Sequence, residues 1–100
     1  MNTSWEYKFT PTPWNVNFDV SEDFATIESE NNKTIAEVNR NDDAEEMKAN
    51  AHLLNAAPKM YLFIELVSKV SHDPELRNHA QFLLREANGE KPEIRKGNQK

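Results

Sequence analysis

Alternating apolar and polar residues in the first part of the chain predict a small β-sheet. The alternation is strict over residues 14–20, whose apolar positions are Trp14, Val16, Phe18 and Val20. This period is typical of an antiparallel strand with one buried face. We predict two further strands over residues 24–28 and 34–39, separated by the polar Ser29–Lys33 segment, in which Asn31-Asn32 tolerates left-handed backbone. Because the connections are short, a three-stranded meander is the simplest arrangement.

The residues before this sheet contain three alternating aromatic side chains. Trp5, Tyr7 and Phe9 occupy every second position, and Pro11 and Pro13 follow them. The two prolines forbid a helix here and favour extended backbone. The pattern predicts either an edge strand or a loosely held arm.

The second part of the chain has the apolar spacing of helices. Residues 44–70 contain many of the strongly apolar side chains, and Pro58 lies within this stretch. We predict one helix that Asn41 or Asp42 caps and that ends near Ala56, because proline disfavours helical geometry in the preceding residue. A second helix is expected from Pro58 to about Ser71.

A third helix is predicted after a short break. Asp73-Pro74 has the composition of an N-cap followed by proline at the first helical position. Gly89 is a natural stop for this helix, because glycine adopts the left-handed conformation that ends many helices. The fold class predicted is therefore α+β: a small antiparallel three-stranded meander, with or without an N-terminal edge strand, packed against two to three C-terminal helices.

The helix expected from Pro58 is apolar on more than one face, which implies that it is buried on more than one face. We expect one side to cover the sheet and the other to meet the flanking helices or a second subunit. The surface expected to bind a partner or a second copy contains Tyr61, Leu62, Leu66 and Lys69. Such a surface predicts a homodimer or a higher homo-oligomer, since exposing several large apolar side chains is unfavourable.

Length and charge restrict the class of protein. The chain has 100 residues, with 17 acidic against 12 basic side chains and a net charge of −5. The length predicts one domain over residues 1–89, and the composition of residues 90–100 predicts a disordered basic tail. The acidic balance argues against binding to a nucleic-acid backbone. Neither a signal peptide nor an apolar run of membrane-spanning length is recognisable, which predicts a cytoplasmic protein that does not enter the membrane.

Residue types that carry chemistry are sparse. The three histidines, His52, His72 and His79, lack the i, i+3 or i, i+4 spacing of helical metal ligands. The acidic residues at 42–46 are explained by their favourable interaction with a helix N-terminus. Both glycines lie late in the chain, so no Gly-rich phosphate-binding loop is present. We therefore predict a non-enzymatic protein with no metal and no cofactor; an enzyme would need Glu45 or Glu46 to work with His52.

Three short motifs resemble a family of small phage and prophage proteins. They are Thr10-Pro11-Thr12-Pro13-Trp14, Ile35-Ala36-Glu37-Val38 and the segment from Ala49 to Pro58, NAHLLNAAP in its last nine residues. The family has a TPGPW-like start, an IAEV-like strand and a helix pair of the NAxLLxAAP kind. Thr12 departs from this pattern, since the family tends to have glycine there. The resemblance implies a phage accessory protein made in a bacterial cytoplasm, and it transfers no functional residue.

Two functional hypotheses follow. The first is a protein that binds and inhibits or redirects a bacterial host or anti-phage defence component, as an anti-CRISPR-like inhibitor does. The second is an oligomeric sponge or sensor for a small nucleotide signal. That hypothesis requires cationic side chains to contact phosphates, and the candidates are Lys33, Arg40, Arg77 and Arg85.

Overall fold

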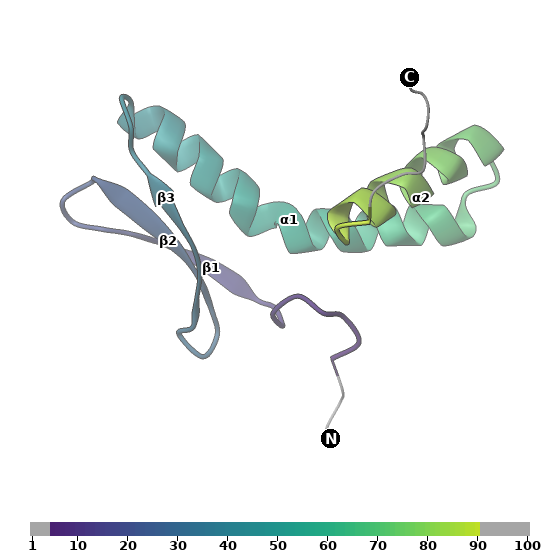
Figure 1. Cartoon of the computed structure of the whole chain (residues 1–100), viewed down its shortest axis with the longest axis horizontal. Helices are drawn as coiled ribbons and strands as arrows, with labels where there is room; N and C mark the ends of the chain where they lie inside the picture. Colours follow the sequence, from purple (N-terminus) through teal and green to yellow (C-terminus); the bar gives the residue numbers. More distant parts are fainter. Residues whose placement is uncertain (1–4, 91–100) are drawn as a thin grey trace. The chain divides into compact units, whose positions relative to one another are not determined.

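The structure is a computed structural model that describes residues 5–90. It contains, in order, β1 (Trp14–Phe18), β2 (Phe24–Ser29), β3 (Thr34–Asn39), α1 (Ala44–Val70) and α2 (Pro74–Ala87) (Figure 1). This is the α+β class that the sequence predicts. The chain divides into two compact units, Met1–Ala57 and Pro58–Lys100, which we call the sheet unit and the helical unit. A single domain over residues 1–89 stays a prediction, and the tail predicted to be disordered lies, except for Glu90, outside the described residues.

The three strands form the predicted antiparallel meander. Their order is β1-β2-β3, so β2 is central and the other two strands are edges. Val16 pairs with Ile27 across β1 and β2, and Ile27 pairs with Ala36 across β2 and β3. These three residues therefore lie in one row across the same face of the sheet.

An irregularity in β3 explains its imperfect alternation. The pairing of Ile27 with Ala36 is followed by the pairing of Glu28 with Thr34, so Ile35 is an extra residue on β3. A β-bulge of this kind locally changes the relation between position and face. Ile35 and Ala36 consequently both pack against the core, although they are neighbours in the sequence.

The first strand is shorter than predicted. β1 ends at Phe18, and Val20 lies in the following turn with 99% of its surface exposed. The turn starts at Asp19, whose side chain accepts hydrogen bonds from the Ser21 backbone and hydroxyl. Such local hydrogen bonds compete with strand pairing, so the prediction of a strand reaching Val20 is wrong.

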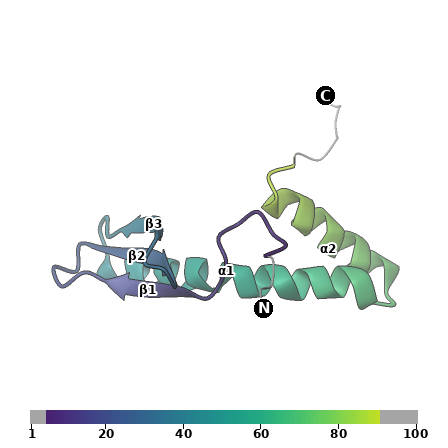
Figure 2. The ribbon, with the colours of Figure 1, turned by 90° about the horizontal axis from the view of Figure 1, so that it is seen from below.

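The core of the sheet unit combines the sheet with the first half of α1. Its buried side chains are Ala25, Ile27, Val38, Met47 and Ala51. Figure 2 shows the three strands alongside this part of α1. We predicted that the helix from Pro58 onward would cover the sheet. Instead the helical part of the core comes from residues 44–57, where Met47 and Ala51 are one turn apart on the same face.

Helix α1 is continuous through Pro58, so the prediction of two separate helices is wrong. Proline in a helix interior lacks the N–H that would bond the carbonyl of Leu54, which usually costs about 3 kcal/mol. Alanines at 56 and 57 favour helix strongly, and the Pro58 ring is buried. These terms oppose the cost of the missing hydrogen bond. The division between the two units falls at Ala57 and Pro58, the place where we predicted the helix to end.

The start of α1 also differs from the prediction. The Asp43 side chain accepts a hydrogen bond from the Glu45 N–H over 2.9 Å, which makes Asp43 the capping residue. Asn41 adopts positive φ instead and turns the chain between β3 and the helix. Neither Asn41 nor Asp42 is therefore the cap.

The N-terminal aromatic residues form a cluster and not an edge strand. The rings of Tyr7 and Phe9 stack with their centres 5.3 Å apart, and Trp5 meets both edge-on. The indole N–H of Trp14 donates to the Thr10 carbonyl over 3.0 Å. The described residues before β1 are thus held by ring contacts and side-chain hydrogen bonds, without ladder pairing.

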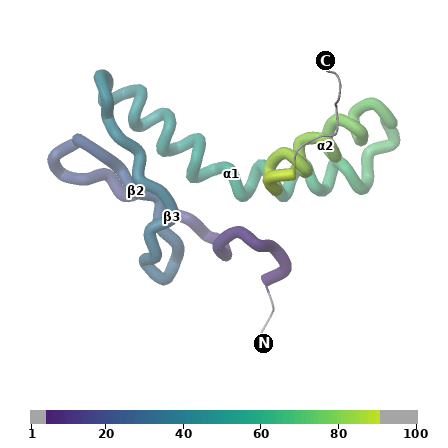
Figure 3. The backbone as a smooth tube through the Cα atoms, viewed as in Figure 1, coloured from purple at the N-terminus to yellow at the C-terminus, as the bar shows by residue number. Residues whose placement is uncertain are grey.

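The helical unit is a hairpin of two helices, whose reversal is visible in the backbone trace of Figure 3. Asp73 caps α2 by accepting from the Glu75 N–H, and Pro74 occupies the first turn, as predicted. Gly89 has a φ of 82°, the left-handed conformation expected at the end of this helix. The Arg77 guanidinium donates to the Ser71 carbonyl over 2.8 Å and so ties α2 to the connection.

Candidate interaction surfaces

The second half of α1 exposes a stripe of large apolar side chains, which we call the α1 stripe. It consists of Leu62, Phe63, Leu66 and Val70. Leu66 is four positions from both Leu62 and Val70 and three from Phe63, which makes them neighbours on one helix face. Phe63 is 64% exposed and Leu66 is 53% exposed. Isolated exposed leucines are ordinary on protein surfaces, whereas contiguous apolar patches usually mark binding sites.

The opposite face of the same helix segment is the one that packs within the helical unit. Ser68 is buried and donates its hydroxyl to the Glu65 carbonyl over 2.7 Å, and Ile64 is half-buried. On α2 the buried residue is Ala80. The hairpin therefore packs around the small residues Ser68 and Ala80 together with half-buried apolar side chains such as Ile64, and it leaves the α1 stripe exposed.

The four residues predicted to form a binding surface do not have the same environment. Leu62 and Leu66 belong to the α1 stripe. The Tyr61 hydroxyl donates to the Asn88 side chain over 3.2 Å, which places Tyr61 toward the end of α2. The Lys69 ammonium lies 3.9 Å from the Glu65 carboxylate. That Tyr61, Leu62, Leu66 and Lys69 take part in binding stays a prediction. The predicted set did not include Phe63 and Val70, which also belong to the α1 stripe.

A second surface is a groove of about 440 Å³ beside the edge strand β3. Its lining consists of Glu37, Val38, Asn39, Asn41, Asn50, Leu53 and Leu54. Leu53 and Leu54 project from α1 and are 60% and 44% exposed. The groove thus joins an unpaired strand edge to apolar side chains of the neighbouring helix.

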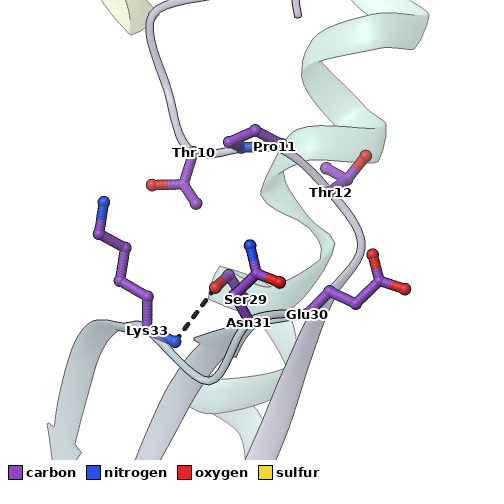
Figure 4. Close-up of a pocket in the computed structure, with 7 residues that line it drawn as sticks. All are labelled: Thr10, Pro11, Thr12, Ser29, Glu30, Asn31 and Lys33. Atoms are coloured by element: carbon purple, nitrogen blue, oxygen red, sulfur yellow. Dashed lines mark hydrogen bonds between the residues drawn. The ribbon is translucent and has the colours of Figure 1, made fainter. Parts of the chain in front are cut away.

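A third surface is a polar pocket of about 320 Å³ between the Thr10–Thr12 segment and the turn that connects β2 to β3 (Figure 4). Ser29 is buried at its base, and its hydroxyl accepts a hydrogen bond from the Lys33 backbone N–H over 3.2 Å. The Lys33 and Glu30 side chains lie at opposite ends of the pocket in this view. The pocket is lined by part of the Thr-Pro-Thr-Pro-Trp motif that the sequence singles out.

Comparison with known protein families identifies one matching family. A family model described as Salmonella phage P22 protein Y8K6 matches residues 1–91. The chain belongs to this phage protein family. No curated protein matches the chain. No solved structure matches it either.

Membership of the Y8K6 family confirms that this is a phage protein, as the resemblance of the sequence implied. The match extends across both compact units, so the sheet unit and the helical unit belong to one family architecture. Within the described residues of this family member, no helix is long and apolar enough to cross a membrane.

The guanidinium groups proposed for anion binding are distributed over both units of the Y8K6-family chain. Arg40 is exposed in the sheet unit, whereas Arg77 and Arg85 belong to α2. Arg77 is half-buried and already bonded to the Ser71 carbonyl, so an anion would compete with that bond. Lys33 is the one candidate that lines a pocket among those described. A nucleotide site built from these residues stays a prediction.

Neither of the two pockets described above is lined by the titratable residues offered as catalytic candidates. The His52 ring meets Phe18 edge-on with the ring centres 5.5 Å apart, and Glu45 forms an ion pair with Lys48 over 3.5 Å. Among residues 5–90, no three His, Asp or Glu side chains are placed to share a metal ion.

The carboxylate of Asp19, in the turn after β1, has a shifted pKa. The hydrogen bonds that it accepts from Ser21, first from the hydroxyl and then from the backbone N–H, lower the pKa of Asp19 below the ordinary range.

Proposed function

We propose that this phage protein acts by binding a bacterial protein, either of the host or of its defence against phages, and inhibits or redirects it without catalysing a reaction. The observation that supports this proposal is the α1 stripe. Burying one such side chain fully contributes about 1.5–3 kcal/mol, so four of them form a surface whose covering is strongly favourable. An apolar helix face that fills a partner's groove is a common recognition mode, with anchors at the spacing seen here.

The stripe is also suited to hold two copies together, and this use remains our prediction of a homodimer or higher oligomer. A helix face with leucines four residues apart matches the geometry of helix–helix packing. Two simple measurements distinguish self-association through the stripe from binding of a bacterial protein. The mass of the purified chain in solution reports self-association, whereas capture from bacterial lysate reports a partner.

The proposal is tested by capture with a charged stripe. The full chain, tagged and expressed in bacteria, is compared with the double variant Leu62→Glu and Leu66→Glu. The matched control is Asn78→Glu with Gln81→Glu, which adds the same charge at two exposed positions of α2. We expect the stripe variant to lose a co-purifying bacterial protein by about tenfold or more, because a carboxylate at a buried anchor is costly, and the control to retain it.

Circular dichroism of both variants verifies that each remains folded, and reconstitution with the captured protein measures inhibition directly. Recovery of the same protein at the same yield from both variants would remove the stripe as the binding surface. A bait that recovers only its own chain from phage-sensitive bacteria would count against the function itself.

A further inference from the structure

A backbone feature of β3 carries a second and independent inference. The Arg40 N–H donates to the Asp23 carbonyl over 3.0 Å at the end of the β2–β3 ladder. In an antiparallel pair, residues alternate between bonding the neighbouring strand and pointing away from it. Arg40 and Val38 are two positions apart, and Val38 is paired with Ala25, so the N–H and C=O of Val38 also point toward β2. The N–H and C=O of the alternate residues, Glu37 and Asn39, therefore point away from β2, toward the open edge of the sheet.

The outward edge lies next to the groove described above. Val38 directs its side chain to the helix-covered face, where it joins the core, and Leu53 and Leu54 of α1 line the same groove. A strand added along β3 would place every second side chain beside Val38 and these leucines. The residues between them would lie on the other face, beside Glu37 and Asn39.

Charge decides which kind of strand fits. Residues 5–57 contain eleven acidic and four basic side chains, whereas residues 58–90 contain five acidic and four basic ones. The negative charge of the described chain is therefore concentrated in the sheet unit. Glu37 is exposed and has no ion-pair partner among the described residues. A second copy of this edge would bring the same strongly negative unit against itself, while a cationic strand would neutralise it.

We propose that the β3 edge binds an extended cationic segment of a partner protein by strand addition. The segment has an apolar side chain that enters the groove against Leu53 and Leu54, flanked in the sequence by Lys or Arg residues that lie beside Glu37. Main-chain hydrogen bonds to the outward peptide groups of Glu37 and Asn39 hold it in register. This binding surface belongs entirely to the sheet unit and does not depend on the α1 stripe.

The experiment uses the full chain and a synthetic peptide of alternating lysine and valine with blocked ends. Binding is followed by NMR titration of the backbone amides and by fluorescence anisotropy of the labelled peptide. We expect the largest shifts and new protection from exchange at Glu37 and Asn39. A peptide of the same sequence, N-methylated at the amides that would face β3, should not bind, since it cannot donate main-chain hydrogen bonds to that strand.

Two variants and one control make the test specific. Asn39→Pro removes an N–H that points away from β2. An edge strand tolerates this loss within its own sheet, but the added strand loses a main-chain hydrogen bond, so the substitution should abolish peptide binding. Glu37→Lys should weaken binding by about tenfold, the equivalent of roughly 1.4 kcal/mol. Glu30→Lys makes the same change of charge on the β2–β3 turn and should weaken binding less than about twofold, as expected from general electrostatics alone. Two-dimensional NMR spectra confirm that each variant keeps its fold.

Several results would overturn the proposal. Equal weakening by Glu37→Lys and Glu30→Lys would mean that the peptide binds the net charge of the unit and not the edge. Retention of binding in Asn39→Pro would exclude strand addition. A dimer that disappears in Asn39→Pro would show that the edge is occupied by a second copy. If the peptide does not bind the parent chain even at millimolar concentration, the proposal of strand addition is also rejected.

Discussion

The Tyr61 hydroxyl donates a hydrogen bond to the Asn88 side-chain oxygen over 3.2 Å, and so links the second half of α1 to the residue that caps the end of α2. The two residues are 27 positions apart in the sequence. Because the hairpin has few buried side chains of its own, a single specific polar contact of this kind contributes noticeably to holding its two helices in place.

Replacing Tyr61 with phenylalanine keeps the ring and removes this donor. We expect a loss of about 0.5–1 kcal/mol in the free energy of unfolding, the usual net value of a partly exposed hydrogen bond. Urea denaturation of the full chain measures it. A double-mutant cycle with Asn88→Ala separates the contact from the capping role of Asn88, and a coupling energy near zero would show that the contact contributes nothing.

Replacing Pro58 with alanine should stabilise α1. Alanine restores the N–H that can bond the Leu54 carbonyl and has a higher helix propensity, while the buried pyrrolidine ring is lost. We expect a net gain of about 1–2 kcal/mol in the free energy of unfolding, measured by urea denaturation with helix content from circular dichroism. A decrease in stability would show that packing of the proline ring outweighs the missing hydrogen bond.

Two methionines on α1 provide a matched test of the core. Met47 is 1% exposed in the sheet unit, whereas Met60 is 46% exposed in the helical unit. Met47→Ala should lower the free energy of unfolding by about 2–4 kcal/mol, because it removes buried methylene groups and leaves a cavity. Met60→Ala should cost less than about 1 kcal/mol, since much of that side chain is already hydrated. Similar losses for both would contradict the assignment of the core.

The turn after β1 should respond to acid in a defined direction. The hydrogen bonds from Ser21 lower the pKa of Asp19 in the folded chain below its ordinary value. The folded state therefore gains stability that is fully present above the ordinary pKa of an aspartate and is lost as the pH falls through the lowered pKa. In Ser21→Ala only the backbone donor remains, so NMR titration should give a higher Asp19 pKa than in the parent chain. An unchanged pKa would show that the hydroxyl does not act on this carboxylate.

The elements that local sequence rules govern were predicted well. Asp73, Pro74 and Gly89 act through bonds and backbone angles within one turn of their own position, so they mark both ends of α2 directly. The alternation similarly predicted a strand from Trp14 to Phe18, of which Trp14 and Val16 pack partly buried against the core while Phe18 is exposed. Asn32 has a φ of 64° in the β2–β3 turn, as the tolerance of asparagine for this conformation led us to expect.

The sequence by itself therefore determined the strand order, the helix that begins at Pro74 and, through the family match, membership of a phage protein family. Only the tertiary structure decided that α1 runs through Pro58, because the burial of the proline ring depends on packing that no local rule contains. It also decided which helical residues cover the sheet, since both halves of α1 are apolar enough to do so. Met47 and Ala51 enter the core because the short connection after β3 brings the first half of α1 onto the sheet.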